Sequence, residues 1–196
     1  MNLTEIKEYI LLQGSESTTV CGGNFVGGIY LQQYPDEIAE VLDYLLKARA
    51  SYSNMLEVGS AAGGNSKVFS EILSINKLYI VDDNNHPRHQ YRPTTLKGLD
   101  YIEYIGNSQS KEAKDWVASI NTKFDIVYID ADHSFDGLYR DTQNFVEFVK
   151  EDGYVILHDT LVCEGVVRAA ARAGDFRLKE IFSSKHKLGI TLFQLL

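Results

Sequence analysis

Acids and histidines gather at two points of the sequence, each directly after an apolar run. Asp130, Asp132 and His133 follow the run FDIVYI, and His158 and Asp159 follow the run YVIL. Packing gives a buried strand no reason to end on such residues, because charged groups are costly to bury. If the two runs are neighbouring parallel strands about 4.8 Å apart, Asp130 and Asp159 converge on one point. Two carboxylates that close share a proton or bind a cation, and His158 would act as a ligand or a general base.

The residues around these acids also have a purely structural interpretation. Asp132 and Ser134 would cap the helix that follows them, while the two histidines would be satisfied within the fold. Asp136 and Asp141 are most simply explained as acids in the first turn of that helix, facing its positive end.

A glycine-rich turn, GSAAGGNS, follows the apolar run LEV. Its glycines let the backbone turn sharply and approach a ligand, and a helix opened by Asn65 or Ser66 would direct free N–H groups at that ligand. The spacing G-x-x-x-G-G differs from the G-x-G-x-x-G of dinucleotide folds and lacks the lysine of a P-loop. Glu57, just before the turn, would repel a pyrophosphate and suits a positively charged ligand. The alternative is a turn without a ligand.

Two further strand ends carry polar residues. Asp82 ends the run KLYIV about half a βαβ unit after the glycines, where an acid commonly accepts hydrogen bonds from ribose hydroxyls. A loop or cap role is the alternative, and it suits Asp83 better. Asn107 and Ser108 follow the run YIEYIG and would meet the edge of an adenine, or else Ser108 or Ser110 begins the next helix.

Short apolar runs alternate with helical stretches from residue 54 onward. The runs are typical of strands buried on both faces of a parallel sheet, over 54–59, 77–82, 101–106, 124–130 and 154–159. Helices are expected between and after them, over 66–73, 111–120, 135–150 and 164–174. The apolar periodicity upstream predicts two helices, over 4–12 with Thr4 as its cap and over 35–48. The last two runs, 176–183 and 188–196, lie close enough for an antiparallel hairpin.

These elements predict an α/β fold, with a doubly wound, mostly parallel Rossmann-like sheet, N-terminal helices and a C-terminal antiparallel hairpin. We expect one domain over 1–196, made of an N-terminal extension (1–50), a ligand-binding core (53–160) and a C-terminal helix and hairpin (161–196). Ligands of such sheets bind beyond the carboxyl ends of the strands, where all the polar residues above fall.

Composition narrows the function classes. A net charge of −8 without a basic stripe argues against a nucleic-acid partner. Cys21 and Cys163 are far apart, which indicates free thiols and a reducing compartment. The sequence has neither an apolar run of about 20 residues nor a start typical of a secretory signal, so we expect a cytoplasmic protein with no membrane contact.

Taken together, LEVGSAAGGNS, VDD, GNS, YIDADHSF and DGYVILHDT resemble the class I S-adenosylmethionine-dependent methyltransferases over residues 53–160. The sequence is most similar to the small O-methyltransferases, which include the catechol and caffeoyl-CoA enzymes and those of sugar and antibiotic pathways. The resemblance implies S-adenosylmethionine as cofactor, a leading segment that closes over it, and Asp132 near its amine. The implied cofactor-binding residues are Glu57, Gly59, Ser60, Ala61, Gly63, Asn65, Ser66, Asp82, Asp83, Asn107, Ser108, Asp130 and Asp132.

The resemblance also implies a role for Asp130, because its counterpart in metal-dependent members of the family ligates a divalent ion beside the transferred methyl group. The partner ligands there are an Asp-Asn or Asp-Asp pair, and this sequence has His158 and Asp159 instead. One expectation is that Asp130, His158 and Asp159 bind Mg²⁺ or another divalent cation, which would lower the pKa of the acceptor hydroxyl. The other is that His158 or His133 removes the proton. The expected catalytic residues are therefore Asp130, His158 and His133.

The expected reaction is O-methylation of a small hydroxylated acceptor, such as a sugar, a phenol or a natural-product intermediate, by a homodimer. The alternatives are a methyltransferase-like binding domain without activity and, less favoured, a nicotinamide-dependent oxidoreductase or a metal-dependent hydrolase. The oxidoreductase lacks its glycine motif, and the hydrolase leaves the glycine turn and Asp82 without a role.

Overall fold

A sheet of seven strands organises the part of the chain that the computed structural model describes, residues 1–14 and 29–196. Its order is β3-β2-β1-β4-β5-β7-β6. The first five strands of this order are parallel, while β7 runs antiparallel to both of its neighbours. The strands are β1 (Asn54–Val58), β2 (Lys77–Asp82), β3 (Tyr101–Ile105), β4 (Phe124–Ile129), β5 (Val149–His158), β6 (Leu178–Ser183) and β7 (Ile190–Leu195). The doubly wound sheet with a terminal hairpin, predicted from the sequence, is confirmed.

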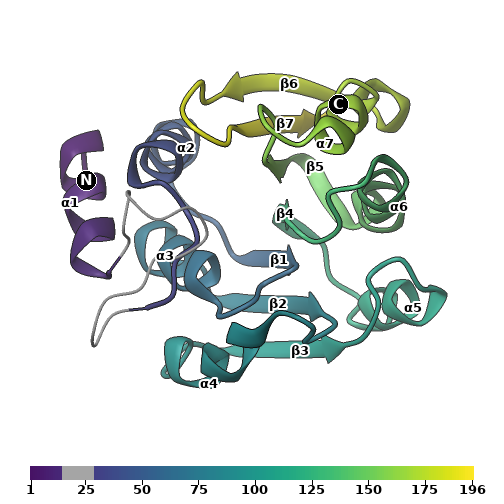
Figure 1. Ribbon diagram of the computed structural model, residues 1–196, viewed down its shortest axis with the longest axis horizontal. Coiled ribbons are helices and arrows are strands. Elements are labelled where there is room, and N and C mark those ends of the chain that lie inside the picture. Colours follow the sequence, from purple (N-terminus) through teal and green to yellow (C-terminus); the bar gives the residue numbers. More distant parts are fainter. Residues whose placement is uncertain (15–28) are drawn as a thin grey trace.

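Helices cover both faces of the sheet (Figure 1). One face is covered by α2 (Pro35–Ala48) and α3 (Gly64–Leu73), with α1 (Leu3–Leu12) packed against α2, and the other face by α5 (Lys111–Ser119), α6 (Phe135–Phe145) and α7 (Glu164–Ala170). A short 3₁₀ turn, η1 (Pro87–Tyr91), leads into α4 (Arg92–Thr95) between β2 and β3; further 3₁₀ turns are η2 (Val146–Phe148) and η3 (Ala173–Phe176). Each face therefore has its own apolar core.

Alternation along the strands decides which polar residues face which core. Met55, Tyr128 and Ile156 belong to the core under α2 and α3, while their apolar neighbours in sequence belong to the core on the opposite face. Because side chains two residues apart share a face, Glu57 and His158 also point toward α2 and α3. Polar groups at the strand ends are thus directed to one side of the sheet.

The structure corrects several predicted boundaries. The capping residue of α1 is Asn2 rather than Thr4, with Glu5 completing a capping box. Helix α3 begins after Gly63, so neither Asn65 nor Ser66 opens it. The helix expected to run to residue 150 ends at Phe145, because β5 already starts at Val149. Ser110 caps α5 and Ser134 caps α6, as expected.

Several other expectations cannot be compared with the structure. Cys21 and most of the expected cofactor-covering segment lie in 15–28, outside the described residues. Among helices of residues 1–14 and 29–196, none combines the length and apolar character that a membrane crossing requires. The cytoplasmic location, the domain boundaries and the homodimer stay predictions.

Asp125 ties the amino-terminal edge of the sheet together. Its buried carboxylate accepts hydrogen bonds from the backbone N–H groups of Ser53 (2.8 Å) and Asn54 (3.0 Å), from Lys150 Nζ (2.8 Å) and from Arg49 Nη1 (3.2 Å). Burial alone would raise the pKa of Asp125, but Lys150 and the two amides hold it below its ordinary value. One side chain thus joins β1, β4, β5 and the end of α2.

Asp141 is buried in α6 rather than exposed in a first turn, so the explanation expected for it is wrong. Ser108 interacts with its carboxyl group, but neither oxygen has a partner at regular hydrogen-bond geometry among the described residues. Burial raises the pKa of Asp141 to about 7. The folded state therefore keeps this proton to a higher pH than the unfolded chain does.

Replacing Asp125 by alanine should lower the free energy of unfolding by about 2 kcal/mol, because two backbone amides and two cations lose a shared partner. Urea denaturation measures this value. The control is Asp115→Ala, which removes an exposed pair with Lys111 and should change stability very little. Equal effects of the two variants would contradict the role of Asp125.

Asp141 should make folding less favourable as the pH rises from about 4 to about 7, because the unfolded carboxyl loses its proton first. Asp141→Asn removes this dependence. The free energy of unfolding of Asp141→Asn minus that of the wild type should be more positive at pH 8 than at pH 5. The change in this difference should be on the order of 2 kcal/mol. Denaturant titrations at both pH values test this, with Asp136→Asn, exposed on the same helix, as control. Parallel pH profiles of wild type and Asp141→Asn would refute it.

Candidate active site at the carboxyl ends of the strands

Four charged side chains meet where β4 and β5 end. His133 Nε2 lies 2.6 Å from Asp159 Oδ2 and 3.4 Å from Asp130 Oδ1. His158 Nδ1 lies 3.3 Å and 3.5 Å from the same two oxygens. The structure thus brings Asp130 and Asp159 together, as expected of neighbouring parallel strands, and adds both histidines. We call Asp130, His133, His158 and Asp159 the aspartate–histidine cluster.

The cluster balances two negative charges with two positive ones. Burial alone would raise the pKa of Asp130, but His158 and His133 hold it well below its ordinary range. Hydrogen bonds to Asp130 and Asp159 raise the pKa of His133 to about 10. Burial alone would lower the pKa of His158, yet the attraction of Asp130 raises it to about 10. The side chain of His133 is 45% exposed and that of His158 only 3%, so His133 is the member within reach of a substrate.

The backbone holds Asp159 in an unusual conformation. Its φ of 59° lies in the left-handed region, which costs a non-glycine residue on the order of 1 kcal/mol. The next two residues are fixed by the turn before β7, since Thr160 N donates to Gly189 O (3.2 Å) and Leu161 N donates to Leu188 O (2.9 Å). The β6–β7 hairpin thus helps to aim Asp159 at the cluster.

The glycine turn lies against the cluster. Gly59 has a φ of 82°, and a Cβ on it would come within 2.3 Å of the carbonyl oxygen of Asp130. A Cβ on Gly64 would come within 2.7 Å of the carbonyl oxygen of Tyr30. Glycine is therefore required at both positions by close backbone contact. The turn is sandwiched between the segment before α2 and the end of β4.

Glu57 is fully buried beneath this turn. Its Oε2 accepts hydrogen bonds from Ser60 Oγ (2.6 Å) and from Ser66 Oγ, while Oε1 has no partner among the described residues. Burial raises the pKa of Glu57 to about 7. The acid expected to face a ligand thus also organises the turn, and Ser60 and Ser66 are engaged with it.

Asp82 is held by the turn and by an arginine that the sequence did not single out. Its Oδ2 accepts from the amides of Ser60 (2.7 Å) and Ala61 (3.0 Å), and its Oδ1 accepts from Asn84 N (2.8 Å). Arg92 Nη2 lies 2.8 Å from Oδ1 at ion-pair distance, without hydrogen-bond alignment. Burial would raise the pKa of Asp82, but Arg92 holds it below its ordinary value.

Arg92 is 2% exposed and joins three parts of the site. It donates to Ala61 O (2.9 Å) in the glycine turn, to Asn84 Oδ1 (3.1 Å) and to Glu103 Oε2 (2.8 Å) on β3. In the sequence it stands in the stretch HPRHQYRPTTLK, whose widely spaced basic residues are typical of an exposed surface. No spacing marks it, because its partners come from three separate loops and strands.

The remaining predicted residues surround the end of β3. Asn107 Oδ1 accepts from Gln109 N (2.8 Å), and Gln109 Nε2 donates to Asp132 Oδ2 (2.9 Å). The other oxygen of Asp132 accepts from Ser134 N (2.8 Å). Asp132 therefore links the ends of β3 and β4, and Gln109 is a site residue that the sequence analysis missed. Ser108 is buried beside Asp141.

Asp83 and Asn65 form no hydrogen bond with the aspartate–histidine cluster within the described residues. Asp83 accepts from the amide and the side chain of Asn85 (2.9 and 2.6 Å), which suits the loop role considered for it. Asn65 is buried in α3, and its Oδ1 has no hydrogen-bond partner within the described ranges.

The cluster also contains a set of atoms suited to a metal ion. In residues 1–14 and 29–196, one group of three potential ligands has all its ligand atoms within 4.8 Å of one another: Asp130, His133 and Asp159. Two carboxylate oxygens and one imidazole nitrogen suit a divalent transition metal better than Mg²⁺, which prefers oxygen alone. His133 thus stands where the sequence analysis expected His158.

Known proteins resemble the chain in sequence and in fold. The family model of the methyltransferase domain matches residues 56–160, which contain the glycine turn, Asp82 and the whole cluster. No curated protein matches the sequence significantly.

Solved structures share the fold. The O-methyltransferase TomG from Streptomyces achromogenes, involved in tomaymycin synthesis and solved with S-adenosylmethionine, is 16% identical with a TM-score of 0.64, over 87% of this chain and 83% of TomG. The N-methyltransferase NodS from Bradyrhizobium japonicum, solved with S-adenosylhomocysteine, is 13% identical with a TM-score of 0.63, over 97% and 98% of the two chains. MycE of the mycinamycin pathway, solved with Mg and S-adenosylhomocysteine, is 12% identical with a TM-score of 0.62; all of this chain aligns, to 54% of MycE.

At these identities the structural likeness extends to the fold alone, whereas the family model compares the sequence itself. That model spans more than half of the chain and includes every motif on which the predicted resemblance rests. The chain therefore belongs to the methyltransferase domain family.

Proposed function

We propose that the protein transfers the methyl group of S-adenosylmethionine to a hydroxyl group of a small acceptor. The observation that carries this proposal is the contact between the glycine turn and the backbone of Asp130. A cofactor held at the turn would present its methyl group beside the aspartate–histidine cluster. Methyl transfer is an in-line displacement, which needs the acceptor oxygen positioned and deprotonated at that point.

The cofactor would lie across the carboxyl ends of β1, β2 and β3. Its ribose hydroxyls would donate to Asp82, which Arg92 and the turn amides keep ionised and fixed. Asn107 and Ser108 would border the adenine, and Asp132 would accept from the methionine amine. The S-adenosylmethionine in TomG and the S-adenosylhomocysteine in NodS and MycE support this choice of cofactor.

The proton of the acceptor hydroxyl would go to His133. Asp159 orients this imidazole at 2.6 Å, as a carboxylate orients a catalytic histidine, and the ring is half-exposed. In the ion-paired cluster His133 carries a proton. Its half-exposed ring would first release that proton to water and would then accept the proton of the acceptor hydroxyl. His158 is too buried to contact an acceptor and would act by holding the two aspartates.

A divalent cation would suit Asp130, His133 and Asp159 as ligands, and when bound it would lower the pKa of the acceptor hydroxyl. MycE, which shares the fold, was solved with magnesium, and this supports a bound cation as part of the proposal. A sugar, a phenol or a natural-product intermediate with a free hydroxyl would then be the acceptor. The competing function is a binding domain that holds the cofactor without turnover.

S-adenosylhomocysteine should stabilise the protein against heat, because it binds the native state alone. At a hundred times its dissociation constant the gain is about 2.7 kcal/mol. Asp82→Asn should weaken this binding about tenfold or more, by removing a charged acceptor of hydrogen bonds. Thermal melts with and without the ligand measure both effects. Asp100→Asn, at the exposed opposite end of β3, is the control. A melting temperature that changes with neither S-adenosylmethionine nor S-adenosylhomocysteine would refute the proposed function.

Asp130→Asn and His133→Gln should each lower methyl transfer at least a hundredfold while the binding of S-adenosylhomocysteine persists, because proton removal fails. Turnover is measured as S-adenosylhomocysteine released with a panel of sugars and phenols, and Asp136→Asn is the exposed control. Binding of S-adenosylhomocysteine by the wild type without turnover of any acceptor would argue for the binding domain, and wild-type activity in Asp130→Asn would contradict the role of Asp130. Binding of Mn²⁺ by chelator-treated protein, followed by electron paramagnetic resonance, should disappear in Asp130→Asn and Asp159→Asn. If the wild type binds no Mn²⁺, the metal is wrong and His133 acts alone.

A further inference from the structure

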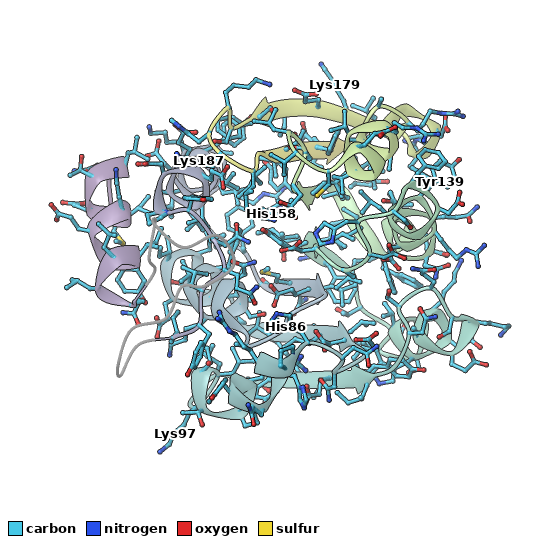
Figure 2. All side chains as sticks on the ribbon, viewed as in Figure 1. His86, Lys97, Tyr139, His158, Lys179 and Lys187 are labelled. Atoms are coloured by element: carbon cyan, nitrogen blue, oxygen red, sulfur yellow. The ribbon has the colours of Figure 1, made fainter. Side chains whose placement is uncertain are left out.

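The buried side of His158 has no role in the reaction proposed above. Its Nδ1 faces Asp130 and Asp159, and its Nε2 lies on the opposite side of the ring. That nitrogen is buried and has no hydrogen-bond partner within residues 1–14 and 29–196. In Figure 2 His158 lies near the centre of the view, whereas Lys97, Tyr139 and Lys179 lie at the periphery. In the charged ring both nitrogens carry a proton, and a buried N–H without an acceptor is unfavourable.

Glu37 has a buried carboxylate oxygen that could accept a hydrogen bond from His158 Nε2. This residue of α2 is completely buried. Its Oε1 accepts hydrogen bonds from the backbone N–H groups of Leu188 (2.6 Å) and Gly189 (2.7 Å). Its Oε2 is buried and, like His158 Nε2, has no partner among the described residues.

The fold brings these two side chains to the same place. Glu37 is anchored at Gly189, and the next residue, Ile190, pairs with His158 in the antiparallel register of β5 and β7. His158 points to the face of the sheet that α2 covers. Burial raises the pKa of Glu37, while the amide of Gly189 and the charge of His158 both lower it. The two groups therefore attract each other within the same buried region.

We propose that Glu37 is a positioning residue for His158, whose Nε2–H it binds through Oε2 across one bridging water. Such a bond fixes the ring so that Nδ1 stays directed at Asp130 and Asp159. Glu37 thus acts on the aspartate–histidine cluster through His158 and does not touch the reacting atoms. The inference rests on the proposed function only in treating the aspartate–histidine cluster as catalytic.

Tyr128 provides a matched control on the same face of the sheet. Its hydroxyl is also buried without a partner among the described residues, and its ring packs edge-on against Phe69. Tyr128→Phe removes one buried polar atom near the cluster but leaves Glu37 and His158 unchanged. An effect of general disturbance would appear in both variants, whereas a bond from Glu37 would be lost in Glu37→Gln alone.

The experiment is nuclear magnetic resonance of the ¹⁵N-labelled full chain, in which two-bond ¹H–¹⁵N correlations report the nitrogen that carries the proton. His158→Gln identifies the signals of this ring. In the wild type, Nε2 should be protonated and its proton protected from exchange with water. In Glu37→Gln the amide oxygen can keep the bonds to Leu188 and Gly189. Its NH₂ group would then face Nε2, so the Nε2 signal should move and its exchange protection should fall, with no such change in Tyr128→Phe.

Turnover gives a second readout. Glu37→Gln should lower kcat about tenfold and leave the dissociation constant of S-adenosylhomocysteine unchanged, as expected of a group one shell away from the reaction. An unprotonated or freely exchanging Nε2 in the wild type would overturn the proposal without any variant. So would ring signals of His158 that respond to Tyr128→Phe and not to Glu37→Gln. If the ring behaves as expected but the protein binds no cofactor, the contact stands and the proposed function falls.

Discussion

The pairing of two aspartates with two histidines is the interaction on which the site depends. Asp130 and Asp159 end adjacent strands, and two ionised carboxylates so close would repel each other strongly. His133 and His158 remove that repulsion, because each imidazole approaches an oxygen of both acids. The left-handed conformation of Asp159 and the packing of Gly59 on Asp130 both require that these strand ends stay together. The glycine turn, proposed to hold the cofactor, and the aspartate–histidine cluster, proposed to carry the reaction, are therefore held together by the same contacts.

A second network fixes the half of the site assigned to the nucleoside. Arg92 connects the glycine turn, the end of β2 and the side chain of Glu103 on β3. Asp82 accepts hydrogen bonds from two backbone amides of the same turn. Because Arg92 is buried and ion-paired, removing it would leave Asp82 without its cation in a poorly solvated place. The acid proposed to bind the ribose is thus oriented before any ligand arrives, which favours binding since less ordering remains to be done.

The sequence allowed the sheet and the meeting of Asp130 with Asp159 to be predicted, since both follow from alternating elements and from the common edge of parallel strands. It did not allow the roles of Arg92 and Gln109 to be predicted, because their partners come from distant loops and no local spacing announces them. Asp141 was misjudged for a related reason. Its position in α6 was readable, but whether a helical acid faces water or a neighbouring loop depends on the packing of that helix.

Buried polar groups are the features that packing alone does not explain. Glu57, Glu37 and Tyr128 are buried, and each has a polar atom without a partner among the described residues. They lie on the face of the sheet to which the strand ends direct His158. A fold tolerates such groups at a cost in stability when they orient other residues, and local departures from packing rules are expected at functional sites. The polar interior beneath the cluster is therefore better explained as support for the reaction than as a defect of the core.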